Sequence, residues 1–185
     1  MVSSSWDYNI KVWNSNPPYN LISTLTHTIK LILSIYYLQE RNKLISVDKY
    51  QTKIWNMKTY QLESIIKGVS TIGKNSICQI ENTIFLGDKG KIVLLNLDTF
   101  TIKQSISYDN NWFRIFSVLQ LSKNIILCGG DGAEFLYDIS NNTITKYYTP
   151  YSVGVSSLVQ FKENIIIESF YSIGLRVLKI INENE

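Results

Sequence analysis

The chain has 185 residues, of which 45% are hydrophobic and 18% are charged. This is enough apolar material for a packed core and too little charge for a disordered chain. The net charge of +3 comes from scattered Lys and Arg residues without a basic run, which argues against a nucleic-acid partner.

Short runs rich in β-branched and aromatic residues follow one another along the chain, separated by Gly, Asn and Asp. Residues 10–14 and 21–26 form the first two runs. Four runs then lie at 31–38, 43–47, 52–56 and 61–66, and their equivalents return about every 41 residues. No segment has the apolar period and the capping residues of a helix, so an all-β protein is predicted.

Two polar markers keep this period. The first follows the third run of each unit, at Asn14, Asn56, Asn96, Asp138 and Lys179. The second is an asparagine that opens the second run, at Asn42, Asn82, Asn124 and Asn164. We therefore predict one array of four-stranded units, at approximately 1–26 (partial), 27–67, 68–108, 109–149 and 150–185 (without its last strand).

Two segments, Ser4–Asn14 and Ser46–Asn56, share a strand with Ser, a turn Asp and a strand that ends in Trp. This pattern resembles the WD40 repeat, which implies a β-propeller whose blades are sheets of four antiparallel strands. In later units the Trp position is taken by Leu95, Tyr137 and Leu178. Kelch propellers are the nearest alternative, but their period is about 50 residues.

The resemblance implies a buried hydrogen-bonded set of a turn Asp, a loop His, a strand Ser and a strand Trp. Its best copy here consists of Asp48, His27, Ser46 and Trp55. Both Trp55 and Trp13 are expected to be buried. His27 is the only histidine and has no metal-ligand spacing around it, so we expect a structural role for it. The sequence predicts no enzyme, no catalytic residue, no cofactor and no metal site, although carboxylates brought together by folding stay open.

A WD40 ring needs more blades than this chain supplies, so an incomplete or open ring is expected. Three explanations stay open. The chain could be a piece of a longer propeller with missing repeats, which we favour. Residues 21–26 could instead close a four-blade ring, or another chain could complete it.

No secretory signal is visible in residues 1–7, and the longest apolar stretch, 31–38, is far shorter than the roughly 20 residues that span a bilayer. The only cysteines, Cys78 and Cys128, lie in apolar runs typical of buried, reduced thiols. We therefore expect a soluble, cytoplasmic protein without a membrane partner.

In the family that the chain resembles, other proteins dock on the loops of one face. Loop aromatic and basic residues are typical of binding hot spots, and the candidates here are Trp6, Lys30, Tyr50, Lys74, Trp112, Arg114 and Tyr151. The leading hypothesis is a non-catalytic protein–protein interaction scaffold. The alternative is a regulatory propeller portion of, or split from, a larger multidomain enzyme or a trafficking or ciliary complex.

Overall fold

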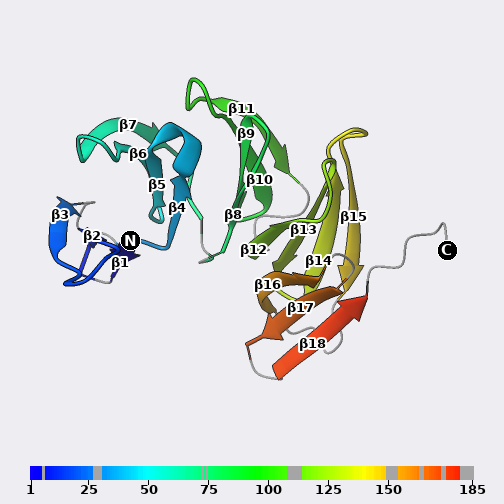
Figure 1. Cartoon of the computed structure of the whole chain (residues 1–185). Coiled ribbons are helices and arrows are strands. Elements are labelled where there is room, and N and C mark those ends of the chain that lie inside the picture. The colour runs from blue at the N-terminus through cyan, green and yellow to red at the C-terminus, as the bar shows by residue number, and fades with distance from the viewer. Residues whose placement is uncertain are drawn as a thin grey trace. The chain divides into compact units, whose positions relative to one another are not determined.

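A computed structural model describes residues 1–5, 7–26, 31–71, 73, 75–107, 114–148, 154–162, 165–171 and 174–179. These residues form antiparallel sheets and one short 3-10 turn, η1 (Gln39–Arg41), and no α-helix occurs among them. The all-β prediction is therefore confirmed. The chain divides into two compact units, Met1–Thr71 and Ile72–Glu185 (Figure 1).

The first unit holds two sheets. The first sheet has three strands in chain order, which are β1 (Val2–Ser4), β2 (Asn9–Trp13) and β3 (Leu21–Thr26). The second sheet has four strands in chain order, which are β4 (Ser34–Leu38), β5 (Lys43–Val47), β6 (Gln51–Asn56) and β7 (Gln61–Lys67).

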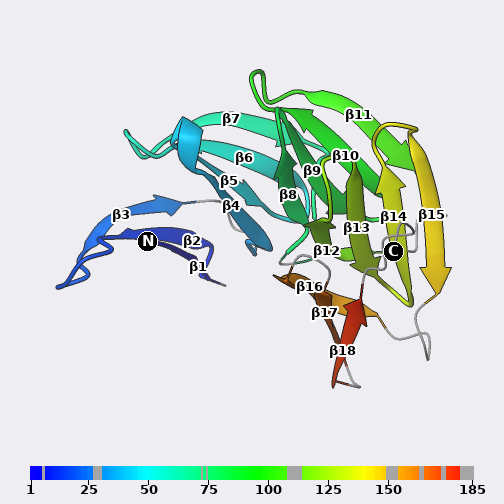
Figure 2. The same ribbon diagram turned by 45° about the vertical axis from the view of Figure 1, so that its right-hand side comes forward.

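The second unit holds three sheets, again with their strands in chain order. The third sheet contains β8 (Ile77–Ile80), β9 (Thr83–Asp88), β10 (Lys91–Asn96) and β11 (Ile102–Ser107). The fourth contains β12 (Ile115–Gln120), β13 (Ile125–Gly130), β14 (Ala133–Asp138) and β15 (Thr143–Tyr148). The fifth contains β16 (Val155–Lys162), β17 (Ile165–Phe170) and β18 (Gly174–Lys179), and β18 forms its free edge (Figure 2).

The first polar marker of the sequence starts the turn after the third strand of a unit. Oδ1 of Asn56 accepts the amide N–H groups of Lys58 and Thr59 at 2.9 and 3.2 Å. Asn96 and Asp138 accept the equivalent pairs of amides at 2.8–3.2 Å. Short side chains with a carbonyl oxygen suit this role, because they replace a backbone acceptor in a tight turn.

The second marker closes the hairpin from the other side. The carbonyl of Asn42 accepts the amide N–H of Met57 at 2.8 Å. The same bond joins Asn82 to Leu97 at 3.0 Å and Asn124 to Ile139 at 2.8 Å. The period of the sequence therefore comes from turn chemistry that is repeated in the second, third and fourth sheets.

One repeated position defines the two faces of each sheet. On β2, β6, β10, β14 and β18 it is taken by Trp13, Trp55, Leu95, Tyr137 and Leu178. We call the face that carries this side chain the front face and the opposite one the back face. Because side chains alternate along a strand, Lys53 shares the front face with Trp55, whereas Ile54 lies on the back face.

Among the described residues, hydrophobic cores join the front of one sheet to the back of the sheet before it. In the first unit, Trp55 and Leu44 pack against the back of the first sheet, at Ile10, Val12 and Leu25. In the second unit, the front of the fourth sheet, at Ile126 and Tyr137, packs against the back of the third, at Phe85, Ile92 and Leu94. The front of the fifth sheet, at Leu158 and Ile166, packs against Leu127 on the back of the fourth.

Candidate functional site

A cluster of residues from several loops surrounds Arg114, which directly precedes β12. Its guanidinium donates to both carboxylate oxygens of Asp131, with Nε–Oδ2 and Nη2–Oδ1 distances of 2.8 and 3.0 Å. The amide of Arg114 donates to Oδ2 over 3.1 Å, and its carbonyl accepts the amide of Asp131 at 3.2 Å. The hydrogen bonds to Asp131 raise the pKa of Arg114, so this side chain is a fixed cation.

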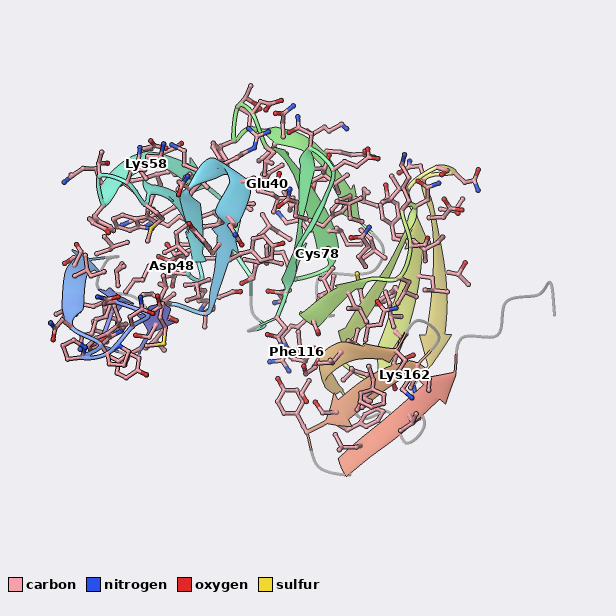
Figure 3. All side chains as sticks on the ribbon, in the orientation of Figure 1. Glu40, Asp48, Lys58, Cys78, Phe116 and Lys162 are labelled. Atoms are coloured by element: carbon pink, nitrogen blue, oxygen red, sulfur yellow. The ribbon has the colours of Figure 1, made fainter. Side chains whose placement is uncertain are left out.

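Two aromatic rings complete what we call the Arg114 cluster, defined as Arg114, Phe116, Asp131 and Tyr171. The Cζ atom of Arg114 lies 5.1 Å from the centre of the Phe116 ring. Phe116 meets Tyr171 edge to face, with ring centres 5.1 Å apart and an interplanar angle of 80°. Phe116 is buried next to the fifth sheet (Figure 3), whereas Tyr171 is 64% exposed. The exposed Tyr171 ring is thus held in place by Phe116, and the exposed Arg114 cation by Phe116 and Asp131.

Only two of the partner-binding residues predicted from the sequence lie in the described part of the chain. Arg114 is exposed, as its alternation with buried Ile115 suggests. Tyr50 is also exposed, in the β5–β6 turn of the first unit, where Lys49 Nζ lies 5.6 Å from its ring centre. The others, Trp6, Lys30, Lys74, Trp112 and Tyr151, lie outside the described residues.

Sequence reasoning missed the residues that hold Arg114. Asp131 stands in the turn between β13 and β14, and Phe116 lies in β12. A signal for Tyr171 was present, because this residue stands where earlier units have the turn Asp. The start of β12, the β13–β14 turn and the β17–β18 turn meet at this point. The spacing of residues along the chain gave no sign of this contact.

The set predicted around Trp55 is formed in part. The indole Nε1–H of Trp55 donates to Oγ of Ser46 at 2.7 Å, and both residues are buried. Asp48 is also buried, but its Oδ1 accepts the amides of Tyr50 and Gln51 in its own turn, at 2.6 and 2.9 Å. His27 lies outside the described residues.

Trp13 forms the same bond in the first sheet, where its Nε1–H donates to Oγ of Ser3 at 2.8 Å. Its predicted burial is wrong, because Trp13 is only half-buried. The physical reason is packing. The front face of the second sheet is covered by the first sheet, whereas no described residue of the first unit covers the front face of the first sheet.

A buried charge cluster lies where the fourth and fifth sheets pack. Arg176 donates from Nε to Oε2 of Glu168 at 2.7 Å, and its Nη2 also contacts Glu134. Burial and, after it, the neighbouring Glu134 carboxylate together raise the pKa of Glu168 to about 7. Burial also raises the pKa of Glu134, against the attraction of Arg176. Folding has therefore brought two carboxyl groups together, but Glu168 is completely buried.

The first unit also contains a hollow of about 490 Å³, open to one side. Apolar and aromatic side chains line most of it, among them Val12, Trp13, Tyr37, Met57 and Tyr60. Its size falls within the range of small-molecule sites. No charged side chain lines it.

Within the described ranges, no three His, Cys, Asp or Glu side chains lie close enough to hold a metal ion. Cys78 and Cys128 are free thiols, and burial raises both pKa values, that of Cys78 to about 12. No helix in these ranges is long and apolar enough to cross a membrane.

No known family model matches this chain, and no curated protein matches its sequence. Its fold is similar to solved structures of computationally designed proteins. The designed protein Ika8 matches 97% of this chain with a TM-score of 0.77 and 22% identity, and the match covers 55% of Ika8. The chain thus spans about half the length of Ika8. The designed protein Ika4 matches 85% of this chain with a TM-score of 0.67 and 21% identity, over 96% of its own length.

The assignment to the WD40 family is therefore wrong. The chain is similar to computationally designed all-β proteins. Its described residues form five separate sheets, none of which closes, and no family model supports the assignment. The misleading pattern has a physical cause. A buried Trp needs an acceptor for its indole N–H, and a Ser on the neighbouring strand provides one, as Ser46 does for Trp55. This Trp–Ser pattern can therefore occur in any pair of packed sheets and is not specific to one family.

Proposed function

We propose that this chain is a non-catalytic protein-binding scaffold and that the Arg114 cluster contacts the partner. The observation that carries the proposal is the fixed position of exposed Tyr171 beside exposed Arg114. Tyr and Arg are the residue types that dominate binding energy at interfaces. Side chains that are ordered before binding lose little conformational entropy when a partner arrives.

The scaffold that we propose consists of propeller-type blades. Each complete sheet runs as a four-stranded antiparallel meander, and the sheets within each unit pack front on back. Blades of a β-propeller have this strand order and stack in this way. Loops between blades then stand on a rigid support, which favours their use in binding.

The non-catalytic part of the proposal rests on the burial of the carboxyl pair. Glu168 is fully buried, and Arg176 holds it together with Glu134. A substrate would have to displace this ion pair before it met either carboxyl group. The alternative role, as a regulatory portion of a larger enzyme or complex, and the cytoplasmic location stay predictions.

The test compares purified variants as baits in a cell extract, with bound proteins quantified by mass spectrometry. Tyr171→Ala and Arg114→Ala should lose the same bound proteins. Tyr19→Ala, which truncates another exposed tyrosine, in the first unit, should keep them. All three should melt within about 2 °C of the parent, because the truncated side chains are exposed. Retention of every bound protein by Tyr171→Ala and Arg114→Ala would contradict the proposal.

A further inference from the structure

The back face of the fifth sheet carries apolar side chains that are largely exposed among the described residues. Val159, Ile167 and Val177 lie opposite one another on β16, β17 and β18, so their side chains form one row on this face. Val177 is 65% exposed and Leu175 on the same strand is 74% exposed. Phe161 of β16 is also exposed. Monomeric proteins rarely leave so many neighbouring apolar side chains in water.

Equivalent positions in other sheets are covered by the front face of the following sheet. Val12 of the first sheet occupies the position of Val177 and is only 6% exposed, because Trp55 and Leu44 pack against that face. Leu94 holds this position in the third sheet and is buried by the fourth. In both cases, a back face of this kind is covered by the front face of another sheet.

The first sheet carries a front face of the required kind. Trp13 and Ser3 form the same hydrogen bond there as Trp55 and Ser46 form in the second sheet, at 2.8 and 2.7 Å. Trp55 is buried by a back face, whereas Trp13 is half-buried. Ser3 is exposed, so this front face is uncovered within the first unit.

We propose that two copies of this chain associate head to tail, with the front face of the first sheet of one copy on the back face of the fifth sheet of the other. Trp13 on the front face would then be buried as Trp55 is, and Val177 on the back face would be buried as Val12 and Leu94 are. The contact uses none of the Arg114 cluster, so either proposal can fail without the other.

The internal contacts also indicate the register of the association. Arg176 on the front of the fifth sheet contacts Glu134 on the back of the fourth. In the first sheet Lys11 occupies the place of Arg176, two residues before Trp13, and in the fifth sheet Leu175 occupies the place of Glu134. Lys11 of one copy should therefore lie next to Leu175 of the other.

The first experiment measures the mass of the full chain in solution by light scattering over a range of concentrations. The expected mass rises above that of the 21.3 kDa chain as concentration increases. Leu175→Arg places a cation next to Lys11 and should shift the association at least tenfold toward higher concentration. Ile102→Arg changes a residue of comparable exposure on β11 and should leave it unchanged. A parent chain that stays monomeric throughout, or equal effects of both variants, would overturn the proposal.

The second experiment mixes chains that carry only Lys11→Cys with chains that carry only Leu175→Cys and adds a short thiol-specific crosslinker. The mixture should give a covalent two-chain product, and a mixture of Lys11→Cys with Ile102→Cys should not. The parent chain, treated in parallel, shows any contribution from Cys78 and Cys128. If the crosslink forms instead only within single chains that carry both substitutions, one chain closes on itself and the proposal is wrong.

Discussion

The indole of Trp55 donates its N–H to the hydroxyl of Ser46 at 2.7 Å, on two strands that pack against the preceding sheet. This bond lets a large apolar ring be buried without an unpaired donor. Because Trp55 is only 4% exposed, the bond sits at the centre of the first unit's core.

Trp55→Ala should lower the free energy of unfolding by about 3–5 kcal/mol, the usual cost of removing a buried aromatic side chain. Ser46→Ala should cost about 1–3 kcal/mol, because it leaves the buried N–H without an acceptor. Trp13→Ala should cost clearly less than Trp55→Ala, since Trp13 is half-buried. Urea denaturation followed by circular dichroism measures all three. Equal losses for both Trp variants would show that the first sheet's front face is covered.

Stability should fall as pH rises, because burial raises the pKa of Glu168 to about 7 from an ordinary value of 4.5. Below pH 4.5 the carboxyl is protonated in both the folded and the unfolded chain. Between pH 4.5 and 7 only the unfolded chain loses the proton, so folding is progressively disfavoured, by about 3 kcal/mol in total.

Glu168→Gln should remove most of this pH dependence and raise the melting temperature above pH 7. Its amide oxygen can still accept a hydrogen bond from Arg176, and the uncharged group no longer opposes Glu134. Thermal melts between pH 4 and pH 8 provide the measurement. Asp138→Asn is a control for removal of a charge from a half-buried turn carboxylate. Parallel pH profiles for the parent and Glu168→Gln would disprove the assignment.

Gly129→Ala should destabilise the second unit by about 1–3 kcal/mol through overpacking. Gly129 lies on the back of the fourth sheet, and a Cβ atom there would lie 2.6 Å from Cγ1 of Val155 on the fifth sheet. Gly154→Ala is the matched control, because its nearest neighbouring atom would be 3.4 Å away. Equal melting temperatures for both variants would show that the two sheets pack less closely than described.

Cys78 and Cys128 should react slowly with thiol reagents at pH 8. Burial raises both pKa values well above that pH, so hardly any reactive thiolate forms in the folded protein. Labelling by a coloured disulfide reagent should accelerate with urea concentration in step with unfolding. Ile102→Cys supplies an exposed thiol and should be labelled at once under native conditions. Equally fast labelling of the parent would contradict the burial of both sulfurs.

Turn chemistry explains why the strands could be predicted from the sequence. The runs at 43–47 and 61–66 became β5 and β7, with bounds that differ by at most one residue. Asn56 accepts amides in the turn after its strand, and Asn42 closes the hairpin, so local polar groups fix where strands end. The same local signals cannot identify a family, because similar short motifs satisfy any pair of packed sheets.

The sequence by itself determined the strands, their turns and the alternation that puts Lys53 and Trp55 on one face, because each depends on neighbours a few residues away. Only the tertiary structure decided which faces are covered. Trp13 and Trp55 follow the same local pattern, yet one is half-buried and the other buried. The Arg114–Asp131 bond and the Glu134–Arg176 contact likewise join residues 17 and 42 positions apart. Such contacts arise when sheets pack, and packing depends on the shape of both surfaces at once.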